Sequence, residues 1–391
     1  MKLRTILFWA HLAAGVVAGS VILIMSVTGA LLTFQQTVLR IVERSQRTVV
    51  PPGPDARRLD ADLLLARVRE GVPGAHPMTV TLESDPHVAV AVALGTQGTV
   101  FVDPYTGAIR GFGSVRARAF YRTVTSWHRY LGAEGERRAT ARAITGACNA
   151  AFLVLAVTGL YLWWPRRWLA RQVKAVVLFR PGLRGKARDF NWHNVIGFWC
   201  APVIVVLTAT GMVISYTWAS NLVYTITGSP RPAASGTGGA AGSRAARQSS
   251  ENPAGARPSL ESVVARAQRE VPTWRTLIVR VPPRPEGAIT VSVSNRNHWN
   301  SFARSTLTVN GDVRWEPYAQ ASAGQKLRGW MRFAHTGELG GLAGEAVAGL
   351  ASAGGAFLVW TGVSLALRRA TAWRSRKRLI PVRETRDVRV A

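Results

Sequence analysis

Four long stretches of this 391-residue chain are almost free of charge, and they constrain its fold more than any other feature. They cover residues 5–34, 143–164, 193–218 and 341–367. A helix needs about 20 apolar residues to cross the roughly 30 Å hydrocarbon core of a bilayer, and each stretch is long enough. The sequence therefore predicts a membrane protein, mainly α, with four transmembrane helices.

A cleaved signal peptide is the alternative for the first stretch, because the chain begins with the basic residues MKLR. The apolar run is longer than the roughly 7–15 residues of a signal-peptide core, and no small-x-small cleavage site closes it before Phe34. We therefore expect an uncleaved first span.

Positive charge predicts the orientation of the spans. The link after the second span, 165–189, holds eight Arg or Lys against one Asp, and the tail 368–391 holds nine against two acids. Positively charged short flanks stay in the cytoplasm, so both termini and this link are expected inside. The same excess accounts for much of the net charge of +28, so it does not indicate a nucleic-acid partner.

The order of elements occurs twice. From His11 to Thr28-Gly29 is seventeen residues, and from His193 to Thr210-Gly211 is again seventeen. After each comes an external segment, a second histidine (His128 or His335) and a span containing Thr-Gly. We predict two tandem repeats in the same orientation, related by a pseudo-two-fold axis along the membrane normal. The four Thr-Gly dipeptides are interpreted as small residues that let helices pack closely.

The two external segments have similar patterns. Each begins with an amphipathic helix pattern and continues with alternating apolar runs joined by Gly, Asp and Pro, which predicts one helix over a small antiparallel sheet. Between the third span and the second unit lies a Gly/Ala/Ser/Pro-rich stretch, which is predicted to be a flexible linker.

The duplication places four histidines in two pairs at two depths. His11 and His193 lie near the cytoplasmic ends of spans one and three, and His128 and His335 lie just before the outward ends of spans two and four. Two neutral imidazoles from facing helices complete the coordination of a heme iron and leave no open position, so each pair is a candidate axial ligand set for heme b. A single histidine at a span end is usually an interfacial residue, but a recurrence in matched pairs favours ligation.

Glycine four residues after a helical histidine lies on the same helix face and leaves room for a flat macrocycle. This position is held after His11, His193 and His128 by Gly15, Gly197 and Gly132, whereas Leu339 follows His335. Heme propionates need cationic partners. The candidates near the inner pair are Lys2, Arg4 and Arg188, and those near the outer pair are Arg129, Arg137, Arg138, Arg328 and Arg332.

Three stretches carry a family resemblance: WHRYLGAEGERRATARAITGACNAAFLVLAVTGLYLWWPR, NWHNVIGFW with its following TATG, and FAHTGELGG with its following WTG. They resemble the PepSY-associated transmembrane family of bacterial inner-membrane proteins, over nearly the whole chain except the linker and the basic tail. The resemblance implies two periplasmic α+β PepSY-like units. Some relatives are diheme reductases of ferric siderophores, and the ligand positions that match theirs are His11, His193, His128 and His335.

The predicted organisation is listed in chain order: helix 1 (1–34), PepSY-like unit 1 (35–116), an interfacial helix and loop with His128 (117–140), helix 2 (141–165), a basic cytoplasmic loop (166–190), helix 3 (191–218), the linker (219–258), PepSY-like unit 2 (259–320), an interfacial segment with His335 (321–340), helix 4 (341–367) and a basic cytoplasmic tail (368–391).

Two functions remain open at this point. The first is an inner-membrane oxidoreductase with two hemes b that passes electrons to a ferric siderophore in the periplasm and releases Fe(II) for iron acquisition. No nicotinamide or flavin motif is present, so its electron donor is another protein, a quinol or a diffusible reductant. The second is a non-enzymatic membrane module that binds peptides or regulates a periplasmic protease. No residue is assigned a catalytic role.

Overall fold

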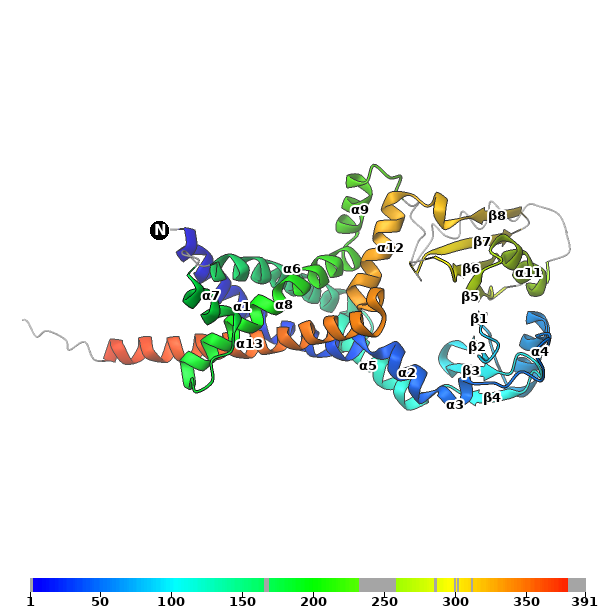
Figure 1. Cartoon of the computed structure of the whole chain (residues 1–391), viewed down its shortest axis with the longest axis horizontal. Helices are drawn as coiled ribbons and strands as arrows, with labels where there is room; N and C mark the ends of the chain where they lie inside the picture. The colour runs from blue at the N-terminus through cyan, green and yellow to red at the C-terminus, as the bar shows by residue number, and fades with distance from the viewer. Residues whose placement is uncertain are drawn as a thin grey trace, which may run out of the picture. The chain divides into compact units, whose positions relative to one another are not determined.

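The computed structural model describes residues 3–164, 169–231, 258–284, 287–298, 300, 302–310 and 312–378 (Figure 1). The chain divides into two compact units. The helical unit consists of Met1–Thr33, Thr123–Tyr216 and Ala334–Ala391. The sheet unit consists of Phe34–Arg122 and Thr217–Phe333.

Four long helices form the body of the helical unit: α1 Leu3–Thr33, α6 Arg137–Trp163, α8 Gly185–Ser215 and α13 Gly341–Arg378. Each is long and apolar enough to cross a membrane, with best-window mean hydropathies of 2.2, 1.8, 2.0 and 1.6. The prediction of a mainly α-helical membrane protein with four spans is confirmed at this level. The short helix α7, Ala170–Val177, lies in the predicted basic loop.

The four long helices pack in a ring. Helix α1 adjoins α6 and α13, and α8 adjoins the same two helices. Consequently α1 and α8 occupy opposite corners of the bundle, and α6 and α13 occupy the other two. The interior of the ring holds small and branched apolar residues, among them Ala156, Ile204 and Ala351.

Shorter helices precede or follow the spans: α2 Gln35–Val42, α3 Arg44–Arg47, α5 Val115–Tyr130, α9 Thr217–Ile226 and α12 Ala323–Thr336. Helix α9 corrects the linker prediction, because residues 219–226 are helical and Val223 and Tyr224 are buried. Most of the remaining linker prediction, 232–257, lies outside the described residues.

The sheet unit contains one antiparallel sheet in the order β4-β3-β2-β1-β5-β6-β7-β8. The strands are β1 Thr79–Glu83, β2 Val90–Ala93, β3 Thr99–Val102, β4 Ile109–Phe112, β5 Trp274–Arg280, β6 Ile289–Asn295, β7 Arg304–Asn310 and β8 Asp312–Glu316. Single turns of 3-10 helix lie at Gly95–Gln97, Tyr318–Gln320 and Glu338–Gly340. The two small sheets expected from the sequence are therefore joined, because β1 pairs with β5 from Thr79↔Arg280 to Glu83↔Thr276.

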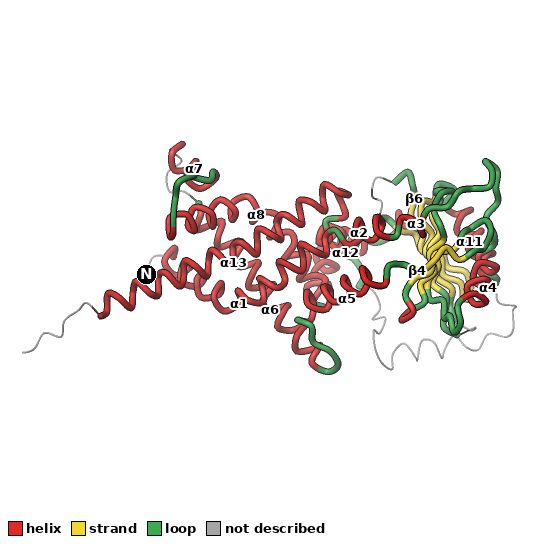
Figure 2. The backbone as a smooth tube through the Cα atoms, turned by 90° about the horizontal axis from the view of Figure 1, so that it is seen from below, coloured by secondary structure: helices red, strands yellow, loops and turns green. Residues whose placement is uncertain are grey.

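Two helices, α4 Ala61–Gly71 and α11 Leu260–Glu270, cover one face of this sheet (Figure 2). Alternate strand residues such as Val80 and Leu277 point into the core beneath them and are almost fully buried. Period-two burial explains why the strands could be recognised in the sequence. One face of the sheet thus supplies a single core shared by both halves.

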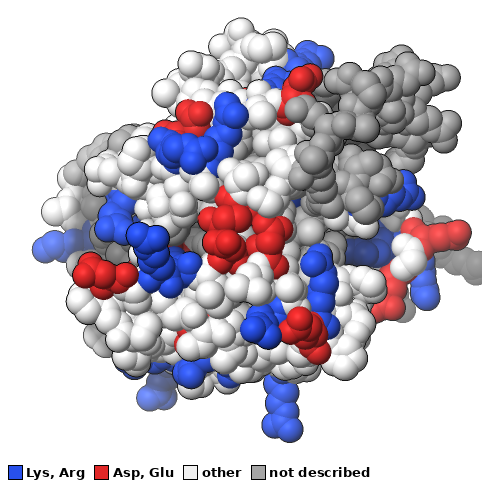
Figure 3. Space-filling model, turned by 90° about the vertical axis from the view of Figure 1, so that its right-hand side faces the viewer, with Lys and Arg blue, Asp and Glu red and all other residues white. Residues whose placement is uncertain are grey.

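The N-termini of α4 and α11 bind each other reciprocally. The Asp62 carboxylate accepts the backbone N–H groups of Leu260 and Glu261 at 3.1 and 2.9 Å, and the Glu261 carboxylate accepts the N–H of Ala61 at 2.8 Å. Acidic side chains gather near the middle of the face that these helices occupy (Figure 3). Carboxylates at helix N-termini satisfy free N–H groups and complement the helix dipole.

Candidate functional site

The helical unit brings the four histidines of the sequence analysis together in two pairs. His11 of α1 and His193 of α8 face each other with ring centroids 6.5 Å apart, and their ring planes differ by 85°. His128 of α5 and His335 of α12 also have centroids 6.5 Å apart, with planes at 55°. The pairing of histidines expected from the duplication is the pairing found in the fold.

This spacing matches two imidazoles on one metal ion. With a metal–nitrogen bond of about 2.0–2.1 Å and roughly 1.1 Å from the nitrogen to the ring centre, two opposed imidazoles have centres about 6.3 Å apart. Both pairs are within a few tenths of an ångström of that value.

Each histidine is held at Nδ1 by a threonine from another helix. The Nδ1–Oγ1 distances are 2.9 Å for His11 and Thr158, 2.9 Å for His193 and Thr361, 3.0 Å for His128 and Thr28, and 3.3 Å for His335 and Thr210. Nδ1 of His128 also lies 3.1 Å from the carbonyl oxygen of Met25, and Nδ1 of His335 lies 2.8 Å from that of Leu207. All four threonines belong to the Thr-Gly dipeptides.

These contacts fix the tautomer of each ring. A threonine hydroxyl has one proton, and all four hydroxyls lie 2.6–2.8 Å from the carbonyl oxygen four residues earlier in their own helix, which accepts it. The hydroxyl oxygen is then left to accept, so Nδ1–H is the donor. A neutral imidazole protonated at Nδ1 carries its free lone pair on Nε2.

A metal ion binds either ring nitrogen of a histidine, and with Nδ1 occupied the nitrogen left for it is Nε2. No hydrogen bond to Nε2 of these four histidines is formed within the part of the chain that the structure describes. A histidine whose Nδ1–H is bound by an acceptor and whose Nε2 is open has the arrangement of a metal ligand supported from behind. Each pair therefore offers two such nitrogens.

The glycine of each Thr-Gly dipeptide makes room for the ring that its threonine holds. A methyl group built on Gly159, Gly362, Gly29 or Gly211 would lie 3.4, 3.5, 3.4 or 3.1 Å from Cε1 of the corresponding histidine. The sequence interpretation of these dipeptides as helix-packing residues was therefore incomplete. They position the imidazoles, with Thr as acceptor and Gly as the space beside it.

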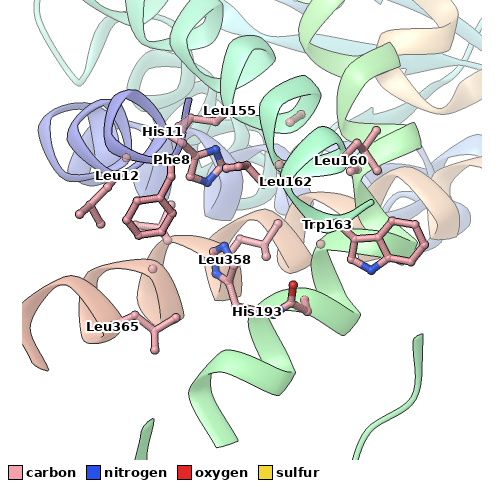
Figure 4. Close-up of a pocket in the computed structure, with 18 of the residues that line it drawn as sticks. Phe8, His11, Leu12, Leu155, Leu160, Leu162, Trp163, His193, Leu358 and Leu365 are labelled. Atoms are coloured by element: carbon pink, nitrogen blue, oxygen red, sulfur yellow. The ribbon is translucent and has the colours of Figure 1, made fainter. Parts of the chain in front are cut away.

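A cavity of about 770 Å³ is lined by both His11 and His193 (Figure 4). Apolar residues such as Leu155, Trp163 and Leu358 form most of its wall, and Gly15 and Gly197 also line it. The volume is within the usual range for cofactor pockets, which is about 300–1,000 Å³. Gly15 and Gly197 therefore line the same cavity as His11 and His193, as the four-residue spacing predicted.

Three cations line the same cavity: Arg4, Lys186 and Arg369. The Arg369 guanidinium lies 5.0 and 4.7 Å from the ring centroids of Phe8 and Trp9. These cations come from the start of α1, the start of α8 and the last part of α13. An apolar cavity with cations at one end suits a flat apolar ligand with anionic groups.

The comparison with known families agrees with this architecture. Residues 8–369 match the family described as the PepSY-associated TM region. The chain belongs to the PepSY-associated transmembrane family. No curated protein matches the chain. The family resemblance noted in the sequence is thereby confirmed, while the resemblance to diheme reductases stays a prediction.

The other predicted cations of this PepSY-associated protein have different surroundings. Arg188 pairs with the buried carboxylate of Asp189 at 2.9 Å, and Lys2 lies outside the described residues. Arg138 lies over the ring of Tyr130 at 4.3 Å, and Arg332 lies over Phe333 at 5.9 Å. Arg138 and Arg188, which belong to the described part of the helical unit, make these contacts rather than contacts with a histidine of either pair.

Gly132 does not lie on the helix face of His128, where the sequence pattern placed it. Helix α5 ends at Tyr130, and Leu131 and Gly132 both have positive φ, 51° and 75°. Gly132 is therefore part of the turn that ends the helix, where glycine adopts the left-handed conformation without strain. A methyl group there would lie 3.0 Å from the Trp127 ring.

Both histidines of the second pair are half-buried. Burial, together with the nearby imidazole of His335, lowers the pKa of His128 to about 4, and burial lowers the pKa of His335. Both rings are neutral at pH 7. Neutral imidazoles are the form that binds a metal ion. Among the described residues, no group of three or more His, Cys, Asp and Glu side chains gathers at either pair.

Sequence reasoning missed two groups of residues at these sites: the threonines that hold the histidines, Thr28, Thr158, Thr210 and Thr361, and two cations that line the cavity, Lys186 and Arg369. The threonines carried a signal, because Thr-Gly recurred at a constant seventeen residues after His11 and His193. The repeat pattern did not reveal that each threonine holds a histidine of another helix. Lys186 and Arg369 carried no signal, since arginine and lysine are frequent in the flanks of every span.

Proposed function

We propose that this protein is a membrane electron-transfer protein that binds two hemes b, one at each histidine pair, and reduces a ferric siderophore in the periplasm. The observation that carries the proposal is the twofold occurrence of the same arrangement. In each pair, two imidazoles face each other at 6.5 Å, each with Nδ1–H held by a threonine and Nε2 open.

The residues fit heme better than a bare metal ion. Each pair offers only two nitrogen ligands, which suit a macrocycle that supplies the remaining four. The first pair also has an apolar cavity of cofactor size, and Arg4, Lys186 and Arg369 at its end suit the two propionates. A heme held by two imidazoles takes up and releases one electron at a time and has no open position for oxygen.

The chain's own residues determine how such a site behaves. The threonines hold the ring planes and keep the proton on Nδ1, which raises the basicity of Nε2. The apolar wall around His11 and His193 excludes water, so the surroundings do not have to reorganise when charge changes. The arrangement therefore favours fast electron exchange over binding of substrates at the metal.

The orientation follows from charge. The flanks around 165–189 and 368–391 are strongly basic, so we place both in the cytoplasm and the sheet unit in the periplasm of the bacterial inner membrane. His11 and His193 then lie toward the cytoplasmic face, and His128 and His335 lie toward the periplasm. We interpret the two α+β halves of the sheet unit as PepSY-like repeats, as the family's name suggests.

A ferric siderophore is chosen because the family resemblance includes such reductases, and Fe(II) leaves a siderophore more easily than Fe(III). The donor is a protein, a quinol or a diffusible reductant. Heme as cofactor and siderophore as substrate are therefore tested separately.

Heme is tested by purifying the full chain and measuring its pigment. We expect two hemes b per chain by pyridine hemochrome, a Soret band, and split b-type bands after dithionite reduction. His11→Ala and His335→Ala should each remove about half of the pigment. A colourless protein from heme-sufficient cells would contradict the proposal and leave the non-enzymatic module as the remaining reading.

The substrate is tested with the reduced protein. Dithionite-reduced protein is mixed anaerobically with individual ferric siderophores, while heme reoxidation is followed optically and Fe(II) is captured by ferrozine. Ferrozine-bound Fe(II) that appears together with reoxidation supports the reductase. Pigment that is not reoxidised by any chelate would keep the heme assignment and reject the substrate.

A further inference from the structure

One aromatic side chain occupies the centre of the bundle between the two histidine pairs. Phe152 of α6 lines the cavity that also contains His11 and His193. It packs against the cluster of Ala156, Ile204 and Ala351, which come from α6, α8 and α13. The phenyl ring therefore lies inside the helical unit and packs against a cluster to which α8 and α13 contribute.

Gly355 of α13 connects Phe152 with a residue next to the second pair. A methyl group built on Gly355 of α13 would lie 3.1 Å from Cζ of Phe152 and 2.9 Å from Oγ of Ser26. Ser26 is the next residue after Met25, whose carbonyl oxygen accepts from Nδ1 of His128. Gly355 thus lies beside both Phe152, which lines the first site's cavity, and Ser26, whose neighbour Met25 binds His128 of the second site.

Phe152 also breaks the symmetry of the two halves. Phe152 and Gly355 each lie six residues before their Thr-Gly threonine, Thr158 and Thr361, so they are equivalent positions under the proposed duplication. Helices α6 and α13 occupy opposite corners of the bundle, so equivalent positions meet at the axis. Two phenylalanines would collide there, and two glycines would leave a void. One phenylalanine ring that faces one glycine fills the space at the axis without a collision and without a void.

We infer that Phe152 is a positioning residue that couples the two sites. Its phenyl ring fills the space at the pseudo-two-fold axis between them and excludes water from that space. This inference rests on the proposed function. The step concerned is the transfer of one electron from the reduced heme of one pair to the oxidised heme of the other, with no bond or proton exchanged. Packed atoms carry an electron better than a void, whose lining has lost its contacts.

The test uses the full chain with its hemes in sealed proteoliposomes. The protein is reduced with dithionite, and an excess of the impermeant chelate ferric EDTA is added outside. The heme nearer the outside should be reoxidised first and the distant heme second, by transfer across the bundle. We expect Phe152→Gly and Phe152→Leu to slow the second phase relative to the first.

A swap variant separates coupling from simple packing. Phe152→Gly combined with Gly355→Phe returns one ring to the axis from the opposite helix, and we expect it to restore the second phase. Heme content, reduced spectra and the melting temperature of the protein with and without heme are measured for every variant. Gly355→Phe alone should overpack the axis and lower the melting temperature.

The outcomes distinguish failure of the proposed function from failure of the role assigned to Phe152. A wild-type protein without heme, or with hemes that exchange no electrons, would overturn the proposed function. Heme-replete Phe152→Leu with the wild-type second phase would overturn only the role of Phe152. A swap variant that recovers its melting temperature but not its second phase would also overturn that role.

Discussion

Nδ1 of His193 lies 2.9 Å from Oγ1 of Thr361, and Gly362 leaves the imidazole room to lie against α13. A dipeptide that looks like a packing motif in the sequence therefore supports a histidine of another helix. The same relationship occurs at all four histidines, which makes it the most testable feature of the fold.

Replacing Thr361 by Val keeps the shape of the side chain and removes the acceptor for Nδ1–H of His193. Loss of such an outer partner typically lowers the affinity for the bound metal by about 10- to 100-fold. We expect weaker heme retention at the first pair and a higher midpoint potential, because a less basic imidazole stabilises the oxidised form less. Heme titration and redox potentiometry measure both effects.

Thr361→Ser is the matched control, because serine retains the acceptor oxygen. It should retain heme and keep a potential near that of the wild type. If Thr361→Val behaves like Thr361→Ser in both measurements, the threonine contributes only to packing.

Glycine substitutions should have graded effects. A methyl group on Gly211 would lie 3.1 Å from Cε1 of His335, whereas one on Gly362 would lie 3.5 Å from Cε1 of His193. The first distance requires the ring to move, and the second is ordinary contact. We expect Gly211→Ala to alter the spectrum and potential of the second pair, and Gly362→Ala to change those of the first pair little. Equal effects would argue against the packing at Gly211.

The ring planes predict different magnetic signatures. The planes of His11 and His193 differ by 85°, and those of His128 and His335 by 55°. Imidazoles split the iron d orbitals least when their planes are perpendicular, so g anisotropy is greater for the first pair. EPR of the oxidised protein should show two low-spin signals, and His193→Ala should remove the more anisotropic one. One signal common to both pairs would contradict these orientations.

A buried ion pair should stabilise the sheet unit. The Glu43 carboxylate is fully buried and binds the Arg118 guanidinium through two hydrogen bonds of 2.6 and 2.8 Å. Arg118→Met would leave the carboxylate buried with the weaker contact to Arg47 at 3.5 Å. Breaking one side of a buried pair costs about 3–5 kcal/mol. We expect a lower melting temperature in detergent.

Glu43→Gln is the comparison for this pair. It removes the buried charge, and the partly exposed Arg118 can be solvated. It should therefore destabilise the protein less than Arg118→Met. The reverse order would show that the carboxylate is not held as a buried charge.

The sequence predicted the elements that depend on local pattern. The spans followed from apolar runs, and the strands of the sheet unit followed from period-two alternation, as at Thr79–Glu83 with its alternating burial. It did not predict that β1 pairs with β5, because pairing between strands nearly 200 residues apart leaves no local mark. It also placed a linker across residues that α9 shows to be helical.

The sequence by itself determined four apolar stretches of membrane-spanning length and the spacing of the four histidines along them, because hydrophobic length and spacing are properties of the chain. Only the tertiary structure determined which side chains face one another. Thr361 meets His193, Phe152 meets Gly355, and Gly132 leaves the helix face, because helix ends, crossing positions and side-chain directions depend on how the helices pack.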